Sequence, residues 1–246
     1  MIGIARACAI GLIWACASGM AGSVHAEIIH CPAIAGADGD ELAQADARAR
    51  LDWLDAHLMR ERRRALIWSW GWGGGFAASG VGSLVAVPLD SREHRIDWYT
   101  SAVSSAIGVL PFLVAPLDVI ADAKELHVRL GSAPSSHSDL CALLADAEAR
   151  LARDAQNEAT ERAWWMHAGN LAFNAGVLLF LGLGYHHWGS GVIDGVGGAV
   201  VGEVMIFTQP TGSIEDLESY RAGRLSNGTR SAAVRPYGGW LFTRRF

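Results

Sequence analysis

The sequence predicts an all-α protein made of two copies of one unit, in which an amphipathic helix precedes an apolar helical hairpin, with a short extended tail at the C-terminus. Three observations lead to this fold class: four long segments almost free of charge, Ala-rich charged segments with leucines at helical spacing, and short stretches that recur about 100 residues apart. Of 246 residues, 51% are hydrophobic and 18% are charged. Soluble domains average about 25% charged residues, so the composition favours a membrane protein. A net charge of -5 without a basic face argues against nucleic-acid binding.

Residues 1–26 have the pattern of a secretory signal peptide. Arg6 precedes an apolar stretch, and Val24-His25-Ala26 places small residues at the two positions that signal peptidase recognises. We expect cleavage after Ala26 and export to the cell envelope. The alternative is an N-terminal anchor helix that is retained.

Cleavage would leave two cysteines, Cys31 and Cys141. An even pair in an oxidising compartment predicts a disulfide, which would close a long loop. The alternative is two separate buried thiols.

A stretch of seven residues indicates an internal duplication. Residues 45–51 recur as 145–151 with six of seven identical, and later matches follow in the same order, such as Ile96-Asp97 with Ile193-Asp194. We therefore expect a tandem duplication with short deletions. The predicted divisions are a first repeat, a second repeat and a tail, at 27–134, 135–224 and 225–246.

Each predicted repeat has the same order of elements. An amphipathic helix comes first, an apolar hairpin follows, and a short helix comes after a proline. The amphipathic helices are expected at 41–64 and 140–162, and the short helices at 117–130 and 211–223.

Four apolar segments are each long enough to cross a bilayer, which takes about 20 residues in a helix. Tryptophans lie near their ends, where aromatic side chains meet the membrane interface. We expect two hairpins in the same orientation with the lipid bilayer as their partner, or, alternatively, buried hairpins in a soluble helical bundle. The segments are 65–89, 98–117, 163–185 and 195–214.

A cluster of arginines leaves open which membrane this is. Arg60, Arg62, Arg63 and Arg64 precede the first apolar segment, on the side that a cleaved signal peptide would place outside. Inner-membrane proteins concentrate Lys and Arg on the cytoplasmic side instead. The inner and the outer membrane therefore both stay open.

Glycines in the last apolar segment lie on one helix face. Gly191, Gly195, Gly198 and Gly202 are spaced by 4, 3 and 4 residues. Small residues at this spacing allow close approach of two helices. We expect packing within the hairpin, with a homo-oligomer through the same face as the alternative.

Three acidic residues in the apolar segments are candidates for chemistry. Glu203 lies inside the last segment, where an ionisable group is costly and marks a functional site by default. Asp97 and Asp194 match between the repeats, and the simplest role for them is to cap the helices that they precede. A transport pathway lined by all three is the alternative.

No motif of a known enzyme class is present. His186 and His187 are adjacent and lack the spacing of metal ligands, and no phosphate loop or nucleophile elbow occurs. We expect no metal and no cofactor. The function expected first is a non-enzymatic structural or interaction role in the envelope; a small channel or transporter is second, and a membrane-bound enzyme third.

Overall fold

The computed structural model describes residues 28–132 and 136–225, and within them the chain is all-α, as predicted. The predicted signal peptide lies outside the described residues, as does all of the predicted tail except its first residue. The helices are α1 Glu41–Gln44, α2 Ala47–Ala86, η1 Val87–Leu89, α3 Arg95–Val114, α4 Asp118–Gly131, α5 His137–Glu161, α6 Trp164–Leu179, η2 Phe180–Gly184, α7 Trp188–Thr208 and α8 Gly212–Arg221.

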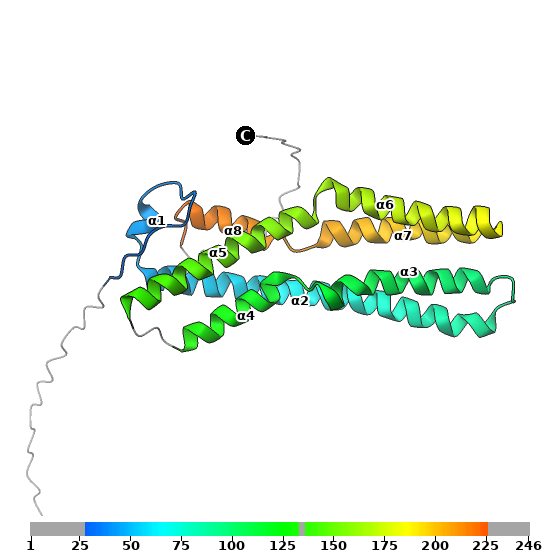
Figure 1. Ribbon diagram of the computed structural model, residues 1–246, viewed down its shortest axis with the longest axis horizontal. Coiled ribbons are helices and arrows are strands. Elements are labelled where there is room, and N and C mark those ends of the chain that lie inside the picture. Colours follow the sequence, from blue (N-terminus) through cyan, green and yellow to red (C-terminus); the bar gives the residue numbers. More distant parts are fainter. Residues whose placement is uncertain (1–27, 133–135, 226–246) are drawn as a thin grey trace, which may run out of the picture.

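The molecule is elongated, with a polar end and an apolar end (Figure 1). The polar end holds α1, the first half of α2, α4, α5 and α8, and we call it the base. The other end consists of two helical hairpins, one of α2 and α3 and one of α6 and α7, whose turns lie together at the far tip. Four helices are long and apolar enough to cross a membrane.

One helix continues from the base into the first hairpin. The predicted amphipathic helix at 41–64 and the apolar segment at 65–89 are largely one rod, since α2 has 40 residues, or about 60 Å at 1.5 Å per residue. No proline interrupts it. The helix predicted to begin at 41 is divided: α1 ends at Gln44, and α2 begins at Ala47, where Asp46 caps it by accepting a hydrogen bond from the amide of Ala49 at 3.2 Å.

The boundaries of the second hairpin differ from those predicted. α7 begins at Trp188 instead of 195 and ends at Thr208 instead of 214. The predicted segment began after the charged Asp194, but the helix includes this aspartate and the glycines before it, of which Gly191 packs against α6. Pro210 follows directly and lacks the amide that would continue the helix.

A buried arginine holds the base together. Arg50 is 0% exposed and donates hydrogen bonds to the carbonyls of Cys31 (2.9 Å) and Pro32 (3.0 Å) and to the hydroxyl of Tyr220 (3.0 Å). Its guanidinium also pairs with Glu148, which accepts a second hydrogen bond from Tyr220 at 2.5 Å. This network joins the N-terminal segment, α2, α5 and α8.

The predicted disulfide links the same region covalently. Cys31 and Cys141 are bonded, with 5.5 Å between their Cα atoms and 110 residues between them in sequence. Closing a loop of this length contributes about 4.7 kcal/mol in the chain-entropy model. The bridge ties the N-terminal segment to α5.

Three of the clustered arginines are engaged inside the protein. Arg60 pairs with Asp216 at 3.0 Å, Arg64 pairs with the buried Glu61 at 2.8 Å, and Arg62 donates to a backbone carbonyl of α4 at 3.1 Å. These contacts attach α8 and α4 to α2. The arginines therefore have a structural reason to lie on the side of the base.

Replacing Arg50 with Met tests the buried network. The change leaves the buried Glu148 carboxylate without its positive partner and the carbonyls of Cys31 and Pro32 without this donor, so we expect a loss of about 3–5 kcal/mol in the free energy of unfolding. The exposed Arg48→Met is the matched control and should change it by less than about 0.5 kcal/mol. Urea unfolding in detergent, followed by circular dichroism, measures both; equal effects would contradict the central place of Arg50.

Candidate functional site

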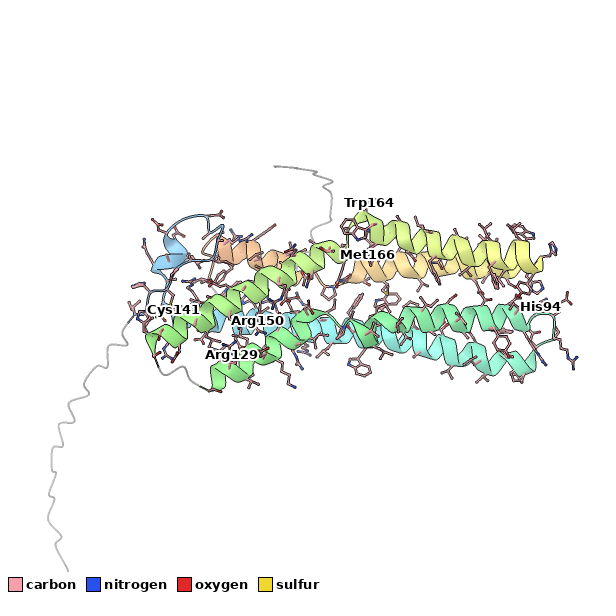
Figure 2. All side chains as sticks on the ribbon, in the orientation of Figure 1. His94, Arg129, Cys141, Arg150, Trp164 and Met166 are labelled. Atoms are coloured by element: carbon pink, nitrogen blue, oxygen red, sulfur yellow. A yellow bond between two sulfur atoms is a disulfide. The ribbon has the colours of Figure 1, made fainter. Side chains whose placement is uncertain are left out.

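The outer faces of the hairpins are apolar and exposed. Trp70 is 77% exposed, Leu113 is 73% exposed, and Phe207 is 63% exposed. Apolar exposure over whole helices is unusual for a soluble protein and typical of a surface that meets lipid. The outer faces of the hairpins are therefore not covered by other described parts of the chain. Figure 2 places Trp164 at the base end of the hairpins and His94 at the tip.

A partly polar cavity lies between the two hairpins. Its volume is about 470 Å³, and residues of α2, α3, α6 and α7 line it. Among the lining residues are seven that carry hydroxyl, amide or carboxylate groups: Ser79, Ser101, Ser104, Ser105, Asn170, Asn174 and Asp194. The polar side chains of the apolar helices thus face one another instead of the outside.

Hydrogen bonds between α3 and α7 close the cavity at the tip. Asp97 accepts a hydrogen bond from the hydroxyl of Ser190 at 2.7 Å, and its other oxygen lies 2.7 Å from Nδ1 of His187. One turn deeper, Ser101 donates to Asp194 at 2.9 Å. The two carboxylates therefore bind the hairpins to each other.

The expected capping role of these aspartates is wrong. The N-cap residues of α3 and α7 are His94 and His187. Asp97 lies in the first turn of α3, and Asp194 lies further inside α7 because that helix begins earlier than predicted. Both carboxylates bond side chains of the other hairpin instead of their own backbone.

Glu203 does not join the other two acids. One of its oxygens lies 2.6 Å from Nδ1 of His167, and the other accepts from the amide of Asn170 at 3.0 Å. Both partners belong to α6, so the contact lies within the second hairpin. Glu203 lines a groove on the outer side of α6 and α7, away from the polar cavity. A pathway lined by all three acids is therefore not what the structure shows.

Serines and asparagines complete the cavity, and the sequence analysis did not single them out. Asn174 donates to the backbone carbonyl of Asn170 at 2.9 Å and to its side chain at 2.8 Å. Ser105 donates to Ser79 of the neighbouring helix at 3.2 Å. Their spacing in the sequence could have revealed these residues, because polar residues three or four positions apart in an apolar segment lie on the same face of a helix.

The four predicted glycines bring α7 close to α6. A Cβ atom at Gly191 would lie 2.8 Å from the carbonyl oxygen of Leu178, and one at Gly195 would lie 2.8 Å from that of Asn174. At Gly198 and Gly202 it would overlap the side chains of Asn174 and Asn170. The glycine face is thus covered by α6 of the same chain.

One group of residues has the spacing of metal ligands in the described part of the chain. It consists of Cys31, His137 and Cys141, whose donor atoms lie within 4.8 Å of one another. The two sulfurs are joined in the disulfide and have no thiolate to offer a metal. This group therefore does not fit a metal centre.

Comparison with known proteins gives no relative: no family model, curated protein or solved structure matches this chain.

A pair of alanine substitutions tests the packing of α7 on α6. Gly195→Ala places a Cβ against Leu178 and the backbone of α6, so we expect a loss of about 1–3 kcal/mol in stability. Gly197→Ala is the control, because nothing lies within 4 Å of a Cβ there and alanine favours the helix. Thermal unfolding in detergent compares them; a more stable Gly195→Ala variant would contradict the close packing.

Proposed function

We propose that this protein is an exported membrane protein of the cell envelope that moves a small cation through the cavity between its two hairpins. The observation that carries the proposal is the cavity itself, where seven polar side chains gather among apolar ones, inside helices whose outer faces are apolar. Groups that cost free energy in a membrane lie where they line a water-filled path or a binding site.

The chemistry of the lining favours a positive charge. Hydroxyl and amide oxygens and the carboxylate of Asp194 face the cavity, and no Lys or Arg is among the lining residues. Carboxylates and oxygen dipoles select cations over anions in pores. Asp97, which accepts a hydrogen bond from Ser190 at the tip, places a second carboxylate between the hairpins.

The arrangement relative to the membrane follows from export. A cleaved signal peptide would place the base on the export side and both hairpin turns on the opposite side. The disulfide in the base suits an oxidising compartment. In this orientation Arg60, Arg62 and Arg64 would lie on the export side of the membrane, and their contacts within the base would account for that position.

We also propose that the chain arose by duplication. Arg50 and Arg150, 100 residues apart, make corresponding contacts. Arg50 of α2 reaches Tyr220 in α8, and Arg150 of α5 reaches Asp122 in α4 at 2.8 Å. Each arginine thus bonds the short helix of the other repeat, as an approximate two-fold arrangement would require.

Flux through reconstituted protein tests the transport proposal. In sealed liposomes with an imposed gradient, we expect the wild type to pass H⁺, Na⁺ or K⁺ faster than empty liposomes, as reported by ion-sensitive dyes. Asp194→Asn removes the cavity charge and should lower that flux at least tenfold.

Glu93→Gln is the matched control, since this acid is exposed at the tip and does not line the cavity. It should leave the flux unchanged. A wild type that passes none of the three cations would contradict transport and favour a structural or interaction role in the envelope.

A further inference from the structure

A small cavity lies in the base where the four apolar segments meet. Its volume is about 10 Å³, about the space of one water molecule. Ala65 lies in α2 where the base meets the first hairpin, Leu117 lies between α3 and α4, Pro210 lies between α7 and α8, and Glu161 ends α5 just before α6. Other lining residues are polar or acidic, and they are Asp118, Asp154, Asn157 and Glu158.

Asp154 differs from its acidic neighbours because neither of its oxygens has a hydrogen-bond partner. Its side chain belongs to a residue that is only 2% exposed. Glu158 accepts from the first amides of α8, at 3.2 and 3.1 Å, and Asp118 accepts from Asn157 at 2.6 Å. Glu161 accepts from Gln209. Asp154 is therefore a buried carboxyl that faces a water-sized space without a donor.

The surrounding charge is negative. Asp118 and Asp122 face Asp154 from α4, and Glu158 lies one turn along α5. Arg153 is the opposing charge, and it is bonded to Asp122 at 2.7 Å. Burial, with these carboxylates, raises the pKa of Asp154 to about 8.

Charged residues on α2 and α8 leave the surroundings of Asp154 negatively charged. Glu61 of α2 adds negative charge near Glu158, and burial raises the pKa of Glu158 to about 7. Glu61 is paired with Arg64, and Asp216 of α8 is paired with Arg60. No positive group from α2 or α8 is recorded against Asp154 among the described residues.

A proton suits this site better than a metal ion. In the part of the chain that the structure describes, these acids do not bring three donor atoms within 4.8 Å of one another. The space holds about one water. A proton neutralises one buried carboxylate without needing either the spacing or the room of a coordinated ion.

We propose that Asp154 is a proton-binding site at the base end of the pathway, and that the transported cation is H⁺. The second half of this statement rests on the transport function proposed above. The proton binds one carboxylate oxygen of Asp154 and is released from it unchanged, with no redox partner. Toward the tip, the carboxylates of Asp194 and Asp97 lie between the hairpins, bonded to Ser101 and to Ser190 and His187.

Infrared spectroscopy of the full chain in detergent tests the bound proton without any transport. We expect the wild-type spectrum to contain the C=O band of a protonated carboxyl at neutral pH that disappears as pH rises through about 8, because a raised pKa keeps the proton until then. Asp154→Asn should lack this component, and the exposed Asp52→Asn should retain it. Identical bands in wild type and Asp154→Asn would overturn the assignment.

Proton flux tests the role of the site. With a pH-sensitive dye inside liposomes, Asp154→Asn should lower proton entry at least tenfold, whereas Asp52→Asn should not. Asp154→Glu keeps the carboxyl and should restore at least part of the flux, which separates lost chemistry from misfolding.

Different results would overturn the transport function and the proton site at Asp154. A wild type that passes Na⁺ or K⁺ but no H⁺ overturns the assignment of the proton and keeps transport. Unchanged proton flux in Asp154→Asn overturns the role of this site and also keeps transport. A wild type that passes no cation overturns transport, and the infrared band then still decides whether Asp154 holds a proton.

Discussion

The hydrogen bonds that Asp97 and Asp194 make between α3 and α7 are the contacts on which the arrangement of the hairpins depends. Each hairpin packs closely within itself, whereas the hydrogen bonds between hairpins come from Asp97 and Asp194 toward the tip and from the indoles of Trp68 and Trp72, which donate to Thr208 toward the base. A carboxylate that faced lipid alone would cost several kcal/mol, so these groups turn inward and find partners across the gap. The polar cavity follows from that constraint.

The base keeps the other end of the cavity in place. Arg50 and the disulfide fix α2, α5, α8 and the N-terminal segment as one unit, and α2 carries this order directly into the first hairpin. The second hairpin leaves the base through the short link after α5. The two hairpins are thus held together at the base and at the tip, and the cavity lies between these two points of attachment.

Residues with strong local signals were predicted well, and those that depend on tertiary contacts were not. Charge-free length predicted the apolar helices, and the count of cysteines after the predicted cleavage site predicted the bond between Cys31 and Cys141. The start of α7 was misplaced because the predicted segment excluded the charged Asp194, which is helical and bonds Ser101 of α3. The partners of Asp97, and the isolation of Asp154, lie on helices far away in sequence, so no local pattern reveals them.

Access of water to the cavity between the hairpins is the most direct test of this account. Gly197 lines the cavity with open space at its Cβ, whereas Leu110 is 52% exposed on the outer surface. Cysteine variants at the two positions, in vesicles with a charged thiosulfonate on both sides, compare the cavity with the lipid face. A water-filled cavity predicts that the thiosulfonate modifies the cysteine of Gly197→Cys and leaves that of Leu110→Cys unmodified. An unreactive Gly197→Cys would show a dry interface between the hairpins and contradict a path for ions.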